Sequence, residues 1–356
     1  MSNITTAERD AIAREDFLAF AQMAFATLYP NTPLSLEWCH EVIANFLTNS
    51  VGKKTRMILN APPRSLKSFL ISVAWVAFRL GHEPTHKFIC ASYSQILADH
   101  LSTECRRIME SDWYKGLFQT RLAKSTEGDL VTTVGGQRAA RSVGGTLTGM
   151  GGNTLIIDDP LSANDANSDA SRNGTNVWFT RTLMSRLNDK ISGSIIVVMQ
   201  RLHQADLTGH LLETPGWDHL ALPAIAQKDV PIQLPNRSFV WRAGEPLQKR
   251  EPLEVLDELK QQIGSPTFYA HYLQEPVPDK GNDLNPDWLK WYEVRPERQP
   301  GDEIVFSCDT AMKASVTSDY SVPGGTLMLS SAQLSMRIDG VDWRAPERQW
   351  RPAVAG

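Results

Sequence analysis

A short segment combines a lysine and a hydroxyl residue in the order that phosphate-binding loops use. The segment is Ala61–Ser68, with the sequence APPRSLKS. The general pattern is G-x-x-x-x-G-K-[ST], in which backbone amides cradle phosphates, the lysine contacts the outer phosphates and the hydroxyl ligates Mg²⁺. Lys67 and Ser68 fit this pattern, but Ala61 and Leu66 replace both glycines. Alone the match is weak, because a residue with a Cβ atom restricts the loop backbone.

The sequence on either side of the loop strengthens the match. Arg56–Asn60 (RMILN) is typical of a short buried strand, and Phe69–Leu80 is typical of a helix that begins directly after the loop. A strand–loop–helix order places the loop amides and the positive helix end where a polyphosphate can bind. We therefore assign nucleotide binding to Ala61, Pro62, Pro63, Ser65, Leu66, Lys67 and Ser68.

A pair of carboxylates follows a second apolar strand. Leu155–Asp158 predicts a buried strand, and Asp159 and Pro160 come directly after it. Such a strand is the expected partner of a phosphate loop: Asp158 would hold the Mg²⁺ shell, and Asp159 would polarise the attacking water. The alternative is a plain turn at the strand end, which Asp-Asp-Pro favours. Taken together, the loop and the carboxylates predict a site for ATP and Mg²⁺ that hydrolyses ATP.

Further polar residues could contact the transferred phosphate. Arg64 lies inside the loop, where a cation can stabilise the transition state as an arginine finger does. Its alternative is a surface arginine paired with a neighbouring carboxylate. Gln200 and Arg201 follow the predicted strand Ser194–Met199, and ligand contacts in doubly wound sheets come from the carboxyl ends of strands. They could sense the γ-phosphate or have a structural role.

Apolar runs alternate with helical patterns before residue 220. Strands are predicted at Arg56–Asn60, Lys87–Ser92, Leu155–Asp158 and Ser194–Met199, and helices at Thr6–Phe25, Leu36–Leu47, Phe69–Leu80, Gln95–Met109 and Trp178–Leu187. The polar, glycine-rich stretch Ser125–Gly152 separates two of the strands. Continuous apolar strands are typical of a mostly parallel sheet covered by helices. The predicted fold class is therefore α/β, a doubly wound P-loop NTPase sheet.

The composition changes after Leu220, where prolines become dense. We expect connecting structure there, with helices near Leu253–Ile263 and Phe268–Gln274, before a new strand at Glu303–Cys308. The predicted organisation is an N-terminal helical region (1–50), an ATPase domain (51–222), a proline-rich connection (223–300) and a second, partial domain with an atypical tail (301–356).

Composition excludes some classes of protein. With 42% hydrophobic and 21% charged residues the chain is typical of a soluble globular protein, and its net charge of −4 argues against a globally basic nucleic-acid binder. The 4 cysteines form no C-x-x-C pair, which favours reduced core cysteines and a cytoplasmic protein. No run of residues is long and apolar enough to span a membrane, and residues 1–16 do not resemble a signal peptide.

These motifs together resemble those of the large terminase subunit of tailed bacteriophages, a DNA-packaging motor. Besides APPRSLKS, the matching pieces are Leu36–His40 (LEWCH), Gly144–Gly152 (GGTLTGMGG), the carboxylate strand (LIIDDP), Val197–Glu213 (VVMQRLHQADLTGHLLE), Phe268–Pro278 (FYAHYLQEPVP) and Phe306–Ala311 (FSCDTA). Loops with an arginine before the lysine and a degenerate first glycine are familiar in this family. Trp38–His40 lies where the family contacts the nucleotide base.

The resemblance implies an ATPase that pulls double-stranded DNA into a preformed capsid. The implied partners are the portal protein, on which the subunits would form an oligomeric ring, and the small terminase subunit, in the cytoplasm of a bacterial host. Carried over by position, Lys67 and Ser68 bind phosphate and Mg²⁺, Asp158 belongs to the Mg²⁺ site, and Asp159 is the catalytic carboxylate. Arg64 matches the family's loop arginine.

The family's second domain is a nuclease of ribonuclease-H-like fold, whose carboxylates hold metal ions. Asp309, after the predicted strand Glu303–Cys308, matches its first metal ligand, and Asp319 falls where a further acidic residue is often found. After Val322 the resemblance stops. We therefore expect an incomplete nuclease domain whose endonuclease function is lost or impaired, through truncation, a frameshift or a degraded prophage gene. The alternative is a genuinely short variant.

Arginines that could contact DNA phosphates are hard to choose from the sequence. Arg138, Arg141, Arg172, Arg181 and Arg186 are candidates, although each taken singly is better interpreted as a solvated surface residue.

Two other functions stay open. A helicase or another nucleic-acid-dependent P-loop ATPase would share the site, although no helicase-type motifs follow residue 220. An inactive prophage remnant would bind nucleotide or the portal without turnover.

Overall fold

A computed structural model describes residues 5–277 and the strands 303–309, 322–328 and 334–338. The chain divides into two compact units, residues 1–278 and residues 279–356. Each unit is described by itself.

An 8-stranded sheet forms the centre of the first unit, in the order β3-β4-β5-β2-β6-β7-β1-β8. Its strands are β1 (Arg56–Asn60), β2 (Lys87–Ser92), β3 (Leu122–Ser125), β4 (Asp129–Thr132), β5 (Gln137–Ser142), β6 (Thr154–Asp158), β7 (Ser194–Met199) and β8 (Asp218–Ala221). The strands from β5 to β8 in this order run parallel, whereas β3 and β4 are antiparallel at one edge. The predicted fold class, a mostly parallel α/β sheet, is confirmed.

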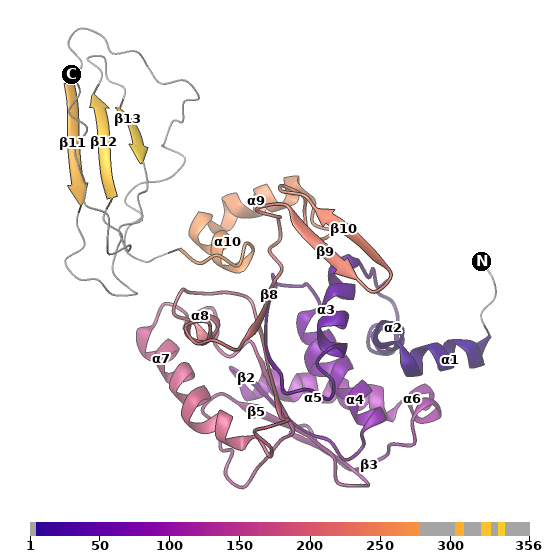
Figure 1. The fold of residues 1–356 in the computed structure, drawn as a ribbon. Coiled ribbons are helices and arrows are strands. Elements are labelled where there is room, and N and C mark those ends of the chain that lie inside the picture. The colour runs from indigo at the N-terminus through magenta and orange to yellow at the C-terminus, as the bar shows by residue number, and fades with distance from the viewer. Residues whose placement is uncertain (1–4, 278–302, 310–321, 329–333, 339–356) are drawn as a thin grey trace. The chain divides into compact units, whose positions relative to one another are not determined.

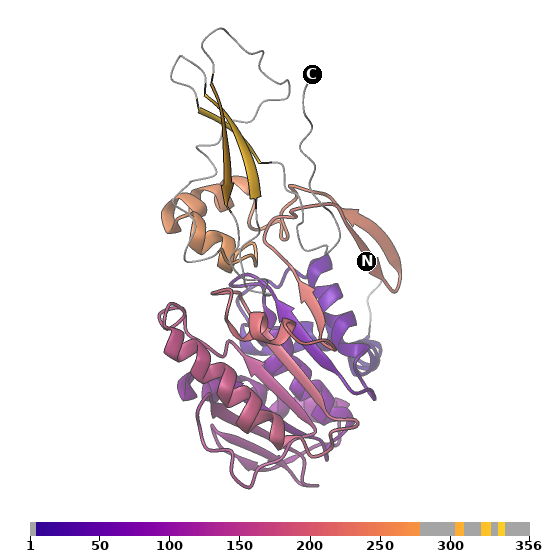
Figure 2. The same cartoon turned by 60° about the vertical axis from the view of Figure 1, so that its left-hand side comes forward.

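Helices cover both faces of the sheet (Figure 1, Figure 2). They are α1 (Thr6–Glu15), α2 (Phe17–Leu28), α3 (Trp38–Thr48), the π-helix η1 (Phe69–Trp75), α4 (Val76–His82), α5 (Gln95–Glu110), α6 (Asp112–Leu117), α7 (Asp169–Trp178), the π-helix η2 (Phe179–Leu183), the 3₁₀ turn η3 (Met184–Arg186) and α8 (Leu207–Leu212). Successive strand residues point to opposite faces. One face of the sheet therefore packs on α1 to α6, and the other on α7, η2 and α8.

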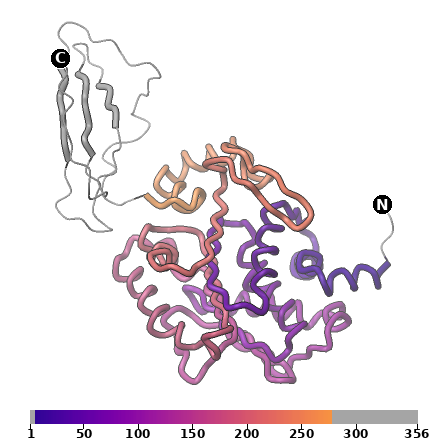
Figure 3. The backbone as a smooth tube through the Cα atoms, viewed as in Figure 1, coloured from indigo at the N-terminus to yellow at the C-terminus, as the bar shows by residue number. Residues whose placement is uncertain are grey.

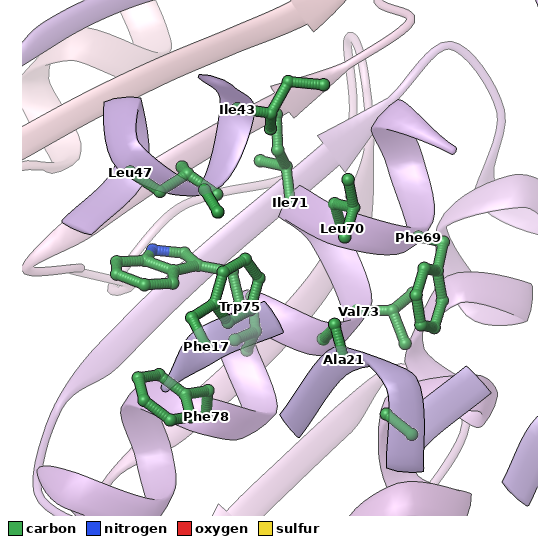
Figure 4. Close-up of a cluster of buried hydrophobic side chains, with 14 of the residues drawn as sticks. Phe17, Ala21, Ile43, Leu47, Phe69, Leu70, Ile71, Val73, Trp75 and Phe78 are labelled. Carbon is green, nitrogen blue, oxygen red and sulfur yellow. The ribbon is translucent and has the colours of Figure 1, made fainter. Parts of the chain in front are cut away.

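The larger core lies between the sheet and the first helices. Figure 4 shows Phe69, Leu70 and Trp75 of η1 together with Phe17 of α2 and Ile43 of α3. This packing fixes the start of η1, and with it the loop that precedes it.

Two N-terminal helices stand where one was predicted. Thr6–Phe25 is interrupted at Asp16, whose backbone is extended and whose carboxylate accepts a hydrogen bond from the Ala19 amide at 2.7 Å. Asp16 is thus the N-cap of α2, a role that aspartate takes readily. The second predicted helix, Leu36–Leu47, begins later than expected, at Trp38.

The polar stretch Ser125–Gly152 contains sheet strands that the sequence did not predict. β4 and β5 lie there, joined by a turn in which Gly135 has a φ of +88°. The small residues Ala139 and Ala140 lack the appearance of an apolar strand, yet they are buried against β2. The helix predicted at Trp178–Leu187 begins earlier, at Asp169.

The segment after residue 222 is more ordered than a connection. It forms the antiparallel hairpin β9 (Val230–Leu234) and β10 (Arg237–Trp241), then α9 (Leu253–Ile263) and α10 (Ser265–His271). The hairpin was not predicted from the sequence because Pro231 and Pro235 lie in it, and proline is rare within strands. The hairpin lies beside α3 (Figure 3), and its residues Ile232, Leu234 and Trp241 join the larger core. Helix α9 has the predicted bounds.

The second unit contains a 3-stranded antiparallel sheet, β11 (Glu303–Asp309), β12 (Val322–Met328) and β13 (Leu334–Ile338), in the order β11-β12-β13. The predicted strand Glu303–Cys308 is confirmed and extends to Asp309. In the part of the chain that the structure describes, no helix is long and apolar enough to cross a membrane.

The larger core predicts the cost of losing one buried ring. Phe20 is 0% exposed and contacts the rings of Phe78, Trp113, Tyr114 and Phe118 at centroid distances of 5.2–6.1 Å. Phe20→Ala should lower the free energy of unfolding by about 3–5 kcal/mol, measured by urea denaturation. Ile96→Ala is the matched control, since Ile96 is 85% exposed and should change stability by less than about 0.5 kcal/mol. Equal effects of the two substitutions would contradict the assigned core.

Candidate functional site

The candidate site lies at the carboxyl ends of three neighbouring parallel strands. The loop Ala61–Ser68 follows β1, Asp159 follows β6, and Gln200 follows β7, which lies between them in the sheet. Ligands of open α/β sheets bind at this edge. The structure therefore brings the loop and the carboxylate pair together from distant parts of the sequence.

Direct contacts join the two segments. The Ser68 hydroxyl donates to Asp158 Oδ1 at 2.9 Å, and Lys67 Nζ lies 3.5 Å from Asp159 Oδ2. The side chain of Lys67 is 7% exposed and that of Asp159 is 27% exposed. Each of the two carboxylates therefore faces one of the two residues that fit the phosphate-loop pattern.

Asp158 is buried and held from two sides. Ser68 donates to one carboxylate oxygen, and the Ser72 hydroxyl of η1 donates to the other at 2.5 Å. Burial, and next the negative charge of Asp159, raise the pKa of Asp158. A bound cation would favour the charged form instead.

The residues around Asp158 fit a magnesium ion. Mg²⁺ takes oxygen ligands and is commonly held by one or two carboxylates and by substrate phosphates. The Asp158 carboxylate and the Ser68 hydroxyl supply such oxygens. Within the described residues no group of three or more His, Cys, Asp or Glu side chains could form a metal centre without a substrate. The Asp158 carboxylate and the Ser68 hydroxyl suit an ion that also takes phosphate ligands.

Asp159 is oriented by the backbone on both sides. Its carboxylate accepts a hydrogen bond from the Gln200 amide at 3.3 Å, and its carbonyl accepts one from the Tyr93 amide at 3.0 Å. Its φ of +45° lies in the left-handed region. The turn aims a partly exposed carboxylate at the loop instead of continuing the strand.

The loop takes its shape without glycine. Arg64 and Leu66 have φ values of +59° and +61°. This conformation costs a residue with a Cβ atom roughly 1–2 kcal/mol. Leu66 occupies a glycine position of the general pattern. The missing glycine, which made the sequence match weak, therefore corresponds to backbone strain in the folded protein. Inside the loop, the Ser65 hydroxyl donates to the Pro62 carbonyl at 2.8 Å.

Arg64 is exposed at the loop surface. Its guanidinium forms no ion pair with the residues that the structure describes, so the alternative of a carboxylate-anchored arginine finds no support there. Its positive charge reaches Tyr272 of the segment after α10, where it opposes the rise in pKa that burial causes. The Arg64 backbone carbonyl accepts a hydrogen bond from Arg250.

Gln200 and Arg201 have different surroundings. Gln200 is half-buried beside Asp159. Arg201 is 9% exposed, and its Nε contacts both carboxylate oxygens of Asp206, at 3.0 and 2.9 Å. Asp206 is also the N-cap of α8. The Arg201 guanidinium thus fixes the turn after β7, which favours the structural alternative for this residue.

Sequence reasoning missed several polar residues at the site. Asn60, the last residue of β1, is 0% exposed and donates to the Met199 carbonyl at 3.1 Å and to Thr208 Oγ1 at 3.0 Å. Ser72 looked like an ordinary helix residue, although its hydroxyl supports Asp158. Asn60 could have been found, since a polar residue at the carboxyl end of a buried strand is a signal in itself.

Of the residues at the start of α3, Trp38 is half-buried and His40 is buried. The Trp38 ring lies 4.9 Å from the Trp241 ring and 5.6 Å from the Phe239 ring, so it is held by the β9–β10 hairpin. His40 is 1% exposed, its Nδ1 accepts a hydrogen bond from the Glu37 amide at 2.8 Å, and burial lowers its pKa.

Two of the candidate DNA-contacting arginines are buried, contrary to the sequence interpretation. Arg138 is 0% exposed and donates to the Ser72 carbonyl at 3.2 Å, and Arg172 is 5% exposed and pairs with Asp169. Arg141 pairs with Asp129 at 2.9 Å. Arg181 is exposed.

Of the two predicted nuclease ligands, Asp309 lies within the described residues. Asp309 ends β11, where its backbone pairs with Val322. Asp319 lies outside the described residues.

Comparison with known proteins finds similarity to phage terminases. The ATPase domain of a Thermus phage large terminase, in variant form, is 11% identical, with a TM-score of 0.47, over 71% of this chain and 98% of that domain. The HK97 bacteriophage large terminase is 12% identical, with a TM-score of 0.48, over 88% of this chain and 64% of that protein. A large terminase from a thermophilic bacteriophage in complex with ATP-γ-S is 11% identical, with a TM-score of 0.42, over 86% of this chain and 63% of that protein.

Other comparisons add little. No family model matches the chain. An uncharacterized protein of Sinorhizobium fredii is 47% identical over 36 residues, which are 10% of this chain and 31% of that protein. The chain thus spans less than two thirds of this relative and of the two longer terminases.

The buried pair Arg201–Asp206 yields a prediction for stability. Asp206→Ala should lower the free energy of unfolding by about 3–5 kcal/mol, because it leaves a buried guanidinium without its partner. Chemical denaturation measures the change. Asp10→Ala is the control, since its pair with Arg9 lies at the surface and should contribute less than about 1 kcal/mol. If the two variants were equally stable, Arg201 would have no structural role.

Proposed function

We propose that the chain binds ATP with Mg²⁺ and hydrolyses it. The observation that carries this proposal is the pair of contacts between the loop after β1 and the carboxylates of β6, Lys67 with Asp159 and Ser68 with Asp158. A cation for phosphate, oxygen ligands for Mg²⁺ and a carboxylate for water then lie at one edge of the sheet.

Lys67 would leave Asp159 and contact the outer phosphates when ATP binds. Its ammonium group is almost buried, which strengthens its attraction to negative charge. The outer phosphates of ATP carry more charge than Asp159, so they would draw Lys67 away from this carboxylate. Asp159, held by the Gln200 amide, would then be free to orient and polarise the attacking water.

Ser68 and Asp158 would hold Mg²⁺. The ion would neutralise charge on the phosphates. Ser72 would keep its hydrogen bond to the second oxygen of Asp158 while the first oxygen faces the ion. Asp158 would thus stay in place when its contact with Ser68 is opened.

Arg64 would act on the transferred phosphoryl group. It is the exposed cation of the loop, and its alternative partner among carboxylates is not found in the described residues. A cation there stabilises charge on the transferred group. Gln200, beside Asp159 at the end of β7, is the residue we propose to sense the γ-phosphate.

We further propose that this ATPase is a terminase-type motor for double-stranded DNA. The motifs from Leu36–His40 to Phe306–Ala311 support this. As in that family, the motor would act in the cytoplasm of a bacterial host, as a ring on a portal protein, with a small terminase subunit. Phosphate contacts would carry DNA binding, and Arg181 is the exposed candidate among the arginines considered.

The site predicts how ATP turnover responds to substitution. Lys67→Ala and Asp159→Asn should each reduce ATP hydrolysis by roughly 100-fold or more, because one removes the phosphate cation and the other the carboxylate for water. Phosphate release measures the rate, with and without double-stranded DNA, which should accelerate the unmodified protein. Lys190→Ala, which alters an exposed lysine away from the site, is the control. Nucleotide binding without turnover in the unmodified protein would favour the inactive remnant instead.

We propose that nuclease activity is lost or impaired, since the family motifs stop after Val322. Supercoiled plasmid incubated with the protein and Mg²⁺ or Mn²⁺ should stay uncut. Cleavage that disappears in Asp309→Asn would refute this proposal and would identify Asp309 as a metal ligand.

A further inference from the structure

The phosphate loop holds a conformation that its own residues resist. Arg64 and Leu66 both lie in the left-handed region, which residues with a Cβ atom rarely adopt. Such residues persist only where surrounding contacts determine the backbone. The one side-chain hydrogen bond within the loop, from Ser65 to Pro62, leaves the Arg64 peptide without support from inside.

That support comes from the segment between β10 and α9. Arg250 donates from Nη2 to the Arg64 carbonyl. Its Nε donates to Gln248 Oε1 at 2.7 Å, and its Nη2 lies 3.2 Å from Glu251 Oε1. A guanidinium is planar, so these bonds on one edge fix the direction in which it meets the loop.

The segment that carries Arg250 is itself anchored on α3. Gln248 is 5% exposed, and its amide nitrogen lies 3.4 Å from His40 Nε2. The Lys249 amide donates to both oxygens of Glu37, at 3.1 and 3.0 Å. The loop is therefore held at Arg64 by Arg250, which α3 keeps in place through Gln248 and Lys249.

We propose that Arg250 is a positioning residue that holds the glycine-less phosphate loop in the conformation that receives ATP. In the general pattern glycine makes this backbone conformation accessible without help. Here a charge-assisted hydrogen bond to the Arg64 carbonyl takes over that role. The inference rests on the proposed nucleotide site.

The proposal predicts that the contact from Arg250 and the strain at Leu66 are coupled in their effect on ATP binding. Without Arg250 the Arg64 peptide can rotate out of the left-handed region, and the strain at Leu66 is relieved with it. The loop amides then no longer converge on phosphate. Glycine at position 66 removes the strain at that residue and leaves the strain at Arg64, so the loop depends less on the contact from Arg250.

A double-mutant cycle tests the proposal. Arg250→Ala should weaken the binding of a fluorescent ATP analogue by about tenfold, near the lower end of the range for a hydrogen bond from a charged group. In the Leu66→Gly background the same substitution should cost about twofold or less. KM for ATP should rise by a similar factor, whereas kcat at saturating ATP should change by less than about twofold, because no reacting group is removed.

The controls separate this proposal from a structural effect. Arg242→Ala removes an exposed arginine of the same segment and should leave binding unchanged. Arg250→Lys keeps the charge but cannot hold Gln248 and the loop together, so its affinity should fall between those of the unmodified protein and Arg250→Ala. Circular dichroism and thermal melting verify folding of each variant.

Two results would overturn the proposal: unchanged affinity in Arg250→Ala, or an equal loss in both backgrounds. Lys67→Ala, measured in the same binding assay, distinguishes the underlying function. If Lys67→Ala abolishes binding while Arg250→Ala does not, the positioning role of Arg250 is wrong and the ATP site stands. If neither substitution affects binding, the proposed site itself is wrong.

Discussion

The parallel pairing of β6, β7 and β1 is the constraint on which the site depends. In register, Asn60 lies opposite Met199, and Asp158 lies opposite Val198, so the three strands end nearly level. The ladder continues past their ends, since the Asp159 amide donates to the Val198 carbonyl at 2.9 Å. A slip of one residue would turn each side chain to the other face of the sheet. Asp158 would then lose both serines, so the apolar packing that sets the register also sets the chemistry.

Residues with strained backbone conformations lie near the same edge of the sheet, at the carboxyl ends of β1, β6 and β7. Among the described residues, the non-glycine residues with positive φ are Arg64, Leu66, Asp159 and Gln274. The first two lie in the phosphate loop and the third is its carboxylate partner. Gln274 accepts a hydrogen bond from the Arg201 amide at 3.0 Å, directly after Gln200. Strain of this kind is characteristic of functional sites. At Arg64 it is sustained by Arg250, in a segment that contacts the start of α3. The sequence suggested these parts only as a connection and a helical region.

An element or a residue role could be predicted from the sequence where the contacts that determine it are local or follow a regular pattern. β1, β2 and β7 have the predicted bounds, because each is a continuous apolar run that a two-sided core requires. The loop and carboxylates could be paired because parallel strands end at one edge. β5 could not be recognised, since its buried Arg138 and two alanines resemble a loop. The roles of Ser72 and Arg250 depend on partners 86 and 186 residues away, so no local pattern contains them.

Arg138 shows how far this support extends from the reacting groups. Its guanidinium is fully buried and donates to the Ser72 carbonyl, while its Nε and Nη1 have no hydrogen-bond partner among the described residues. A buried charge with few partners lowers the free energy of unfolding. If stability were all that mattered, an apolar side chain at this position would therefore be favoured. What Arg138 supplies is a link from β5 to η1, the π-helix whose Ser72 hydroxyl holds Asp158. π-helical turns are frequent at functional sites. This strand, which lies in the stretch that the sequence presented as polar and glycine-rich, thus braces the helix that orients the proposed magnesium ligand.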